Sequence, residues 1–302
     1  MYKTLDTNLL EITGRSTEVI ELAMTYGFVG INVDMMDMFK RSQRASFESA
    51  SRFLVSSKLH VASFAAPVSL DDDDTSFASS LTVLQQVAEI AGKLQANCAV
   101  VNIPTGTNRL PYHEYFDVIR KRIDQVAEVL GQHGVRLALR FCAIPDAEEK
   151  QFKFVRDVEG FVALVKSCSS KNVGIVLDTW NWHLGRGKQS QLDEIGADRV
   201  AIVYISDCKD GVDAAAATCE DRILPNAIGI IDNVAWLKKL GDRQIPITAY
   251  GAAPSGISTR DALIAHVQDT IDEQLTAAGL PTNTRRPETF VAAAASTPYR
   301  ES

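Results

Sequence analysis

The stretch VGIVLDTWNWHLGRG, residues 173–187, gives the clearest indication of the fold. It begins as a continuous apolar run, reaches a single carboxylate at Asp178, and then turns into aromatic and basic residues. A short, continuous apolar run predicts a parallel strand that is covered on both faces. Such a strand would deliver Asp178 to its own C-terminal end, so the partners of this carboxylate become the central question.

The same pattern recurs about eight times along the 302 residues. We expect strands within residues 7–13, 29–35, 60–68, 98–104, 135–141, 172–178, 200–207 and 245–251. Between them, apolar residues spaced three and four apart predict amphipathic helices. Eight strand-then-helix units without an internal linker predict a single-domain α/β protein, a (β/α)8 TIM barrel. We assign residues 1–280 to the barrel and residues 281–302 to a C-terminal tail.

Composition narrows the class of protein. Hydrophobic residues make up 46% of the chain and charged residues 23%, which is typical of a globular protein with a substantial core. The net charge of −7 weighs against a nucleic-acid partner. Five cysteines without CxxC spacing favour reduced thiols. The N-terminal sequence does not resemble a signal peptide, and no apolar run approaches the roughly 20 residues that cross a bilayer. We therefore expect a cytoplasmic protein that binds neither nucleic acid nor membrane.

In a TIM barrel the active site lies at the C-terminal ends of the strands. Here those ends carry a mixture of amides, acids, aromatic residues and one arginine: Asn32, Asp34, Ser63, Asn102, Arg140, Asp178, Tyr204, Asp207 and Tyr250. Histidine is absent from these strand tips, which is unusual for a site that would bind a metal ion.

Several local phrases carry a family resemblance. YGFVGINVD (26–34), LHVASFAAPV (59–68), NVGIVLDTWNWH (172–183) and IVYISDCKDG (202–211) follow one another at the expected spacing. In this order the chain, from about residue 5 to residue 278, resembles the xylose isomerase-like TIM-barrel superfamily of sugar and sugar-phosphate isomerases and epimerases.

The resemblance implies a ligand set that this sequence does not reproduce. Members of the family hold one divalent cation with a glutamate, an aspartate, a histidine and a glutamate from strands five to eight, and the two glutamates move protons. The corresponding places here carry Arg140, Asp178, Tyr204 and Tyr250. Only the aspartate is retained.

These replacements disfavour a divalent cation. Mg²⁺, Mn²⁺ and Zn²⁺ need several oxygen or imidazole donors. Two like unit charges about 4 Å apart repel by about 4 kcal/mol at an effective dielectric of 20, so Arg140 opposes a cation at this place. We expect its guanidinium to occupy the cation's space and to pair with Asp178. No cofactor is expected, and residual metal binding at Asp178 is the alternative.

Each candidate residue also has a structural interpretation. Asp178 is either a catalytic or ligand-binding acid or a carboxylate locked to Arg140. Arg140 is either that counter-ion or an anchor for a substrate carboxylate or phosphate. His183, the second catalytic candidate, is either the remaining general base or a member of an aromatic cluster with two tryptophans.

Five further residues are candidates for substrate binding. Tyr204 and Tyr250 would fill the mouth of the barrel and donate hydrogen bonds. Trp180 could stack on the apolar face of a sugar. Asn102 would bind a hydroxyl group, and Asp207 would either line the pocket or cap its own turn.

Residues 71–74 and 208–231 carry several charged residues, for which we expect mainly structural roles. The acidic run 71–74 is expected to cap a helix or to be solvated. Residues 208–231 are expected to form a long loop, in which Arg222 could reach an anion but would more commonly contact water.

Three functions stay open at this stage. The first is a metal-independent barrel that binds a small sugar, polyol, sugar acid or sugar phosphate, without turnover. The second is an active isomerase, epimerase or lyase with a rebuilt site. The third is a structural subunit that supports a partner, and a homo-oligomer is left open.

Overall fold

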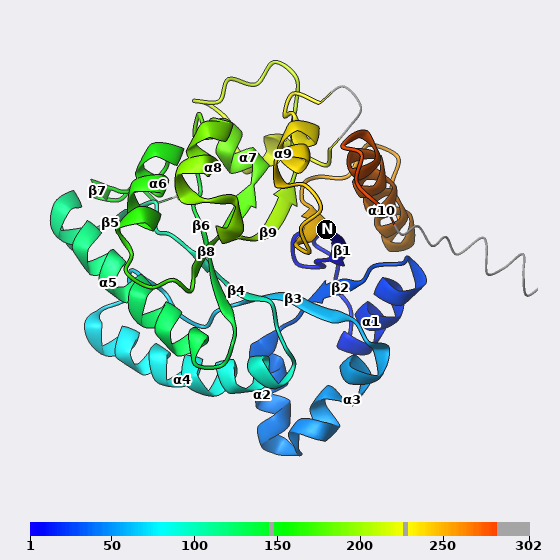
Figure 1. Cartoon of the computed structure of the whole chain (residues 1–302), viewed down its shortest axis with the longest axis horizontal. Coiled ribbons are helices and arrows are strands. Elements are labelled where there is room, and N and C mark those ends of the chain that lie inside the picture. Colours follow the sequence, from blue (N-terminus) through cyan, green and yellow to red (C-terminus); the bar gives the residue numbers. More distant parts are fainter. Residues whose placement is uncertain (145–147, 226–228, 283–302) are drawn as a thin grey trace, which may run out of the picture.

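The computed structural model describes residues 1–144, 148–225 and 229–282. Its centre is a closed barrel of parallel strands in the order β1-β12-β9-β8-β6-β4-β3-β2 (Figure 1). The barrel strands are β1 (Tyr2–Leu5), β2 (Gly30–Asn32), β3 (His60–Ala65), β4 (Cys98–Asn102), β6 (Arg136–Arg140), β8 (Val173–Asp178), β9 (Val200–Ile205) and β12 (Pro246–Ala249). The (β/α)8 TIM-barrel prediction is therefore confirmed.

Helices surround this barrel (Figure 1). They are α1 (Ser16–Thr25), α2 (Met35–Arg44), α3 (Phe47–Ser57), α4 (Asp74–Lys93), α5 (Tyr112–Gly131), α6 (Val158–Ser167), α7 (Thr179–Leu184), α8 (Gln189–Ile195), α9 (Asn233–Leu240) and α10 (Arg260–Ala277), with short 3-10 turns η1 (Ala197–Arg199) and η2 (Cys219–Asp221). Their apolar faces bury against the strands, as the three- and four-residue spacing predicts. None of the helices in the described ranges is long and apolar enough to cross a membrane.

The first strand was predicted at the wrong place. It spans Tyr2–Leu5, and residues 7–13 form turns beyond its C-terminal end. The apolar residues of TNLLEIT suggested a strand, but Leu9 packs over the barrel interior and Leu10 joins the core. The shift makes Asp6, a residue that the sequence pattern did not single out, the first residue after β1.

The loop prediction for residues 208–231 is also incomplete. Two short strands, β10 (Asp207–Cys208) and β11 (Arg222–Ile223), pair antiparallel within this region. A second small pair joins β5 (Gly106–Thr107) to β7 (Phe152–Lys153). The β10–β11 pairing brings Arg222 back to the C-terminal end of the barrel.

The acidic run has a structural role. Asp73 is the N-cap of α4, and its side chain accepts hydrogen bonds from the backbone N–H groups of Thr75 and Ser76. Asp74 forms an ion pair with the buried Arg122 at 2.6 Å. The capping interpretation is confirmed for Asp73, whereas Asp71 accepts hydrogen bonds from the hydroxyl groups of Thr107 and Tyr115. The predicted tail, residues 281–302, lies almost wholly outside the described residues.

Candidate functional site

Asp178 is the last residue of the barrel strand β8. All six residues of β8 are buried, and Asp178 is only 1% exposed. Its side chain also caps α7, because Oδ1 accepts the backbone N–H of Asn181 at 3.3 Å and Oδ2 accepts the Asn181 side-chain amide at 2.8 Å. Strand end and helix cap together fix this carboxylate at the mouth of the barrel.

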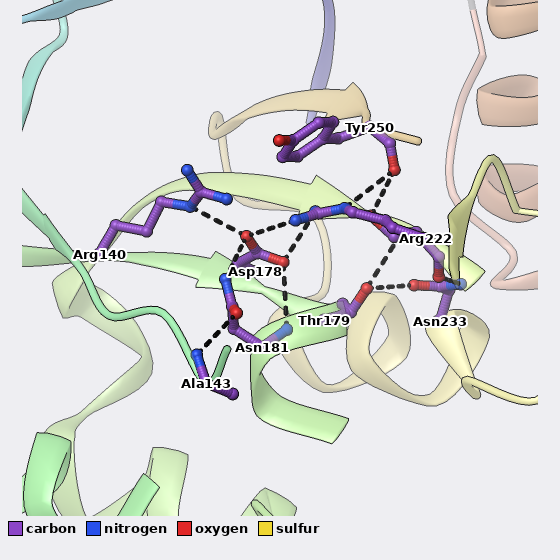
Figure 2. Close-up of polar contacts among 9 residues, drawn as sticks. Arg140, Ala143, Asp178, Thr179, Asn181, Arg222, Asn233 and Tyr250 are labelled. Carbon is purple, nitrogen blue, oxygen red and sulfur yellow. Dashed lines mark hydrogen bonds and ion pairs between the residues drawn. The ribbon is translucent and has the colours of Figure 1, made fainter. Parts of the chain in front are cut away.

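Two arginines hold the same carboxylate (Figure 2). Arg222 binds it with both terminal nitrogens, Nη2 to Oδ1 at 2.8 Å and Nη1 to Oδ2 at 3.1 Å. Arg140 donates from Nε to Oδ2 at 3.0 Å. We call Arg140, Asp178 and Arg222 the arginine–aspartate cluster. The predicted pair between Arg140 and Asp178 is present, and a second arginine joins it.

The charges of the cluster stabilise one another. Burial alone would raise the pKa of Asp178, but the guanidinium groups of Arg222 and Arg140 hold it below its ordinary value. Burial would likewise lower the pKa of Arg140, but the Asp178 carboxylate and the two tyrosines keep it above its ordinary value. Asp178 is therefore an ionised carboxylate whose two oxygens already accept hydrogen bonds.

Arg222 is the residue whose environment the sequence did not reveal. It was expected in a loop that contacts water, yet it is buried and lies 44 residues from Asp178 in the sequence. Its Nε donates to Ser206 Oγ at 2.8 Å and to the Tyr250 carbonyl at 3.2 Å. Its guanidinium carbon lies 3.5 Å from the centre of the Tyr250 ring, a close cation–π contact. All three nitrogens of the Arg222 guanidinium therefore donate hydrogen bonds to the protein.

Arg140 is held less completely. Its side chain is 18% exposed, and among the described residues only Asp178 accepts a hydrogen bond from it, at Nε. The guanidinium carbon lies 5.7 Å from the ring centre of Tyr204 and 5.4 Å from that of Tyr250. Figure 2 shows a contact line from Nε alone and none from the two terminal nitrogens. The terminal N–H groups of Arg140 are therefore open to a ligand or to water.

A cavity of about 670 Å³ opens at this end of the barrel. Arg140, Arg222, Tyr250 and Trp180 contribute to its lining, together with Cys142. This volume is suitable for a small molecule of the size of a sugar or sugar derivative. Of the predicted binding residues, Arg140, Tyr250 and Trp180 therefore lie around one cavity.

Tyr204 lies in the interior of the barrel. Its ring packs with Cys98, Ala138 and Val176, and it meets the Tyr250 ring edge-on at 6.5 Å. Burial raises the pKa of its phenol. Tyr204 fills the space beneath the mouth, and its predicted part in substrate binding stays a prediction. Among the described residues, however, no acceptor for its hydroxyl is found.

Asp207, His183 and Asn102 are outside the cavity lining. Asp207 is buried, and its Oδ1 accepts the backbone N–H groups of Cys208, Ile230 and Ile231 at 2.8 to 3.1 Å, which agrees with the turn-capping alternative. His183 is exposed on α7, because the short helix turns it away from the cluster. Asn102 is exposed and pairs in register with Arg140 across neighbouring strands.

Asp6 is a functional candidate that the sequence did not indicate. It follows β1 directly, is 3% exposed, and its Oδ1 accepts the N–H groups of Asn8 and Leu9 at 3.1 and 3.3 Å. Burial raises its pKa to about 6, although the two backbone hydrogen bonds and Arg140 oppose the shift. If the first strand had been predicted at Tyr2–Leu5, Asp6 would have been among the candidate residues at the C-terminal strand ends.

A network of buried hydrogen bonds adjoins the cluster at the first residues of α7 and α9 (Figure 2). Thr179 donates its hydroxyl to Asn233 Oδ1 at 2.8 Å and accepts the Ser206 N–H at 3.1 Å. The Asn233 amide donates to the Ser206 carbonyl at 2.9 Å. Because Ser206 also receives Arg222, these buried bonds fix the position of that guanidinium.

The cluster does not fit a divalent cation. Such an ion needs several anionic or imidazole donors, but both oxygens of Asp178 are engaged by guanidinium groups. Within the described ranges, no group of three histidine, cysteine, aspartate or glutamate side chains is arranged to hold a metal ion. The guanidinium groups of Arg140 and Arg222 lie beside Asp178, where a cation would have to bind.

Comparison with known proteins identifies the family. The model of the xylose isomerase-like TIM barrel matches residues 20–249. The chain belongs to this family. The resemblance inferred from the local phrases is thereby confirmed.

Individual relatives are more distant. The inosose isomerase of Bacillus subtilis (strain 168) is 24% identical over 147 residues, which are 47% of this chain and 50% of the relative. The match therefore spans about half the length of that protein. It supports common ancestry and leaves the activity of this family member to be established separately.

Solved structures agree with the fold. A xylose isomerase domain protein from Alicyclobacillus acidocaldarius subsp. acidocaldarius superposes with a TM-score of 0.80 at 20% identity, covering 92% of this chain and 99% of the other. The IolI protein, whose structure holds a zinc atom, superposes with a TM-score of 0.74 at 17% identity, covering 92% and 98%. At these identities the likeness concerns the fold alone.

Proposed function

We propose that this family member binds a small sugar, polyol or sugar acid at the mouth of its barrel without a divalent metal ion, and that it does so without turnover. The observation that carries the proposal is the double engagement of Asp178 by Arg140 and Arg222. The guanidinium of Arg140 takes the role of positive charge that a metal ion has in the family's usual site. The free thiols of all five cysteines support a cytoplasmic location, which stays a prediction.

The geometry supports binding more than proton transfer. Asp178 is ionised, buried and saturated with hydrogen bonds, so it is poorly suited to exchange protons with a ligand. The cavity instead presents hydrogen-bond donors from Arg140 and aromatic surface from Tyr250, whereas Trp180 borders it but is only 2% exposed. Aromatic walls with a few polar groups are typical of carbohydrate binding.

Metal analysis of the purified protein tests the first half of the proposal. Thermal-shift measurements with Mn²⁺, Mg²⁺, Co²⁺ and Zn²⁺ follow it, because an ion that binds the folded state raises the melting temperature. We expect no stoichiometric metal and no concentration-dependent stabilisation. Stoichiometric metal, or a clear stabilisation by one ion, would refute the metal-free proposal.

A rebuilt site provides the matched control. Arg140→Glu, Tyr204→His and Tyr250→Glu restore the family's donors, but Arg222 would still neutralise Asp178. We therefore expect metal affinity only when Arg222→Met is added to the triple variant. Metal binding by the triple variant alone would show that Arg222 does not control the charge of the site.

The second candidate is an active isomerase, epimerase or lyase with a rebuilt, metal-independent or shifted-metal site. Asp6 favours it, because this buried acid near Arg140 and Tyr204 has a pKa of about 6, which is suited to proton exchange near neutral pH. The roles of Asp178 and His183 as catalytic residues belong to this candidate and stay predictions.

Incubation with inososes and simple ketoses, followed by NMR, separates the two candidates. Binding without new signals supports the first. Conversion that is lost in Asp6→Asn and kept in His183→Gln would establish the second and would assign its proton-transfer residue.

A further inference from the structure

We propose that the ligand of this cavity is an oxyanion, a sugar acid or a sugar phosphate, whose charged group docks on the two open terminal nitrogens of Arg140. The inference rests on the proposed function, since it names the class of ligand that the same cavity takes. The juxtaposition that carries it is an incompletely bonded guanidinium in a cavity of about 670 Å³, next to a second arginine.

The first step is that Asp178 has no capacity for a ligand. Its Oδ1 accepts Arg222 Nη2 and the Asn181 N–H, and its Oδ2 accepts Arg140 Nε, Arg222 Nη1 and the Asn181 amide. A carboxylate has about four lone-pair sites. With five bonds made, this carboxylate does not accept the hydroxyl groups of a neutral sugar in addition.

The second step is the asymmetry between the arginines. Arg222 uses all three of its nitrogens on Ser206, Tyr250 and Asp178. Arg140 uses Nε alone, and no described residue accepts from Nη1 or Nη2. A guanidinium that lies mostly out of solvent is strongly stabilised by acceptors at its remaining donors. The planar pair of Nη groups matches the two oxygens of a carboxylate or phosphate.

The third step is the balance of charge at the cavity. Two guanidinium groups line it, whereas Asp178 lies beneath them and is 1% exposed. Glu11 and Glu220 also line the cavity, but both are exposed, so solvent and salt screen them. Asp6 is buried outside the lining. The groups that a ligand meets at depth are therefore positively charged.

The walls account for the rest of the ligand. Tyr250 presents aromatic surface, and the lining also includes Leu9, Leu10 and the nearly buried Trp180. An apolar wall beside a cationic floor fits a ring with hydrophobic C–H faces and one terminal oxyanion. A neutral polyol would satisfy the walls and leave the Nη groups of Arg140 without a charged partner.

The test compares three probes of similar size on the full-length protein: glucose, glucuronate and glucose 6-phosphate. Binding is measured by calorimetry and by tryptophan fluorescence, since Trp180 lines the cavity. At least one of the anions is expected to bind at least about tenfold more tightly than glucose, because a charge-assisted contact is added. The preferred anion then distinguishes a carboxylate ligand from a phosphate ligand.

Variants assign the preference to Arg140. Arg140→Met should weaken anion binding by about 10- to 100-fold and glucose binding by less than about fivefold, because glucose loses only uncharged acceptor contacts. Arg140→Lys, which keeps the charge but loses the planar fork, should recover only part of the affinity. Arg136→Met is the matched control, because Arg136 begins the same strand at the opposite end of the barrel and should leave binding unchanged.

The outcomes separate this inference from the proposed function. Equal affinity for glucose and both anions would overturn the oxyanion inference and leave sugar binding standing. No binding of any of the three probes would count against both. If Arg140→Met does not fold, a salt titration of the unaltered protein decides the question, since added salt should weaken anion binding and not glucose binding.

Discussion

Replacing Arg222 by methionine should destabilise the protein far more than the same replacement of Arg140. Arg222→Met removes both bonds of 2.8 and 3.1 Å to Asp178, the bonds to Ser206 and Tyr250, and the stacking on the Tyr250 ring. Asp178 would keep one guanidinium bond, from Arg140 Nε at 3.0 Å. Because Asp178 is 1% exposed and the Arg222 side chain 5%, water cannot replace what is lost.

The magnitudes follow from this difference in burial. Removing one partner of a buried ion pair costs about 3–5 kcal/mol of unfolding free energy. Arg140→Met removes one charge-assisted hydrogen bond from a side chain that is 18% exposed, so partial solvent screening limits its cost to about 1.5 kcal/mol. The unfolding free energies of the two variants should therefore differ by about 1.5–3.5 kcal/mol.

Urea unfolding at neutral pH, followed by circular dichroism and tryptophan fluorescence, measures both variants. Asp178→Asn and the double variant with Arg222→Met complete a double-mutant cycle, in which we expect a coupling energy of at least about 2 kcal/mol. The pKa of Asp178 lies below its ordinary value in the folded protein. Its stabilising contribution is present above the unfolded pKa of about 3.9 and is lost as the pH falls through the folded pKa.

Two results would refute this reasoning. A cost for Arg222→Met that is no larger than that for Arg140→Met would show that the bidentate pair is not the stronger anchor. Additive effects of Asp178→Asn and Arg222→Met would show that the two residues do not stabilise one another.

Three further predictions concern stability. Asp6→Asn should be more stable than the unaltered protein at pH 8 by up to about 3 kcal/mol, because the pKa of Asp6 is raised to about 6 and its ionised form is disfavoured by burial. The gain should shrink as the pH falls below about 6 and vanish by about pH 3, where both the folded and the unfolded state are protonated. A gain in urea unfolding that is independent of pH would contradict the assignment. Gly251→Ala should cost at least about 2 kcal/mol in the same assay, since its added Cβ would overlap the Ile223 backbone beside Arg222. Asp73→Ala should lower the midpoint of thermal unfolding by loss of the α4 cap, and an unchanged midpoint would dispute that role.

Local patterns in the sequence were sufficient for most of the fold. The apolar run before Asp178 predicted a buried strand, and its counterparts along the chain predicted seven of the eight barrel strands close to their observed places. This works because strand and helix periodicity are properties of neighbouring residues. The first strand failed for the same reason, since the apolar residues of 7–13 pack over the barrel end as a turn.

The only site residues that the sequence could predict were those at the C-terminal ends of the barrel strands, because the fold brings these ends together. Strand ends of a barrel meet at one rim, so Arg140 beside Asp178 followed from counting strands. His183 was expected within reach because it lies five residues beyond Asp178, yet α7 turns it toward solvent. Nothing in that spacing indicated the direction of the side chain.

The barrel, the family resemblance, the retained aspartate and the arginine beside it could therefore be read from the sequence. That Arg222 binds the same carboxylate, and that Asp6 lies buried near the cluster, became evident only from the folded chain. Arg222 reaches Asp178 across 44 residues through a pairing of two-residue strands, which leaves no periodic trace in the sequence. The charge of the site is thus a property of long-range contacts, because a buried carboxylate and a guanidinium stabilise each other only after folding has removed both from water.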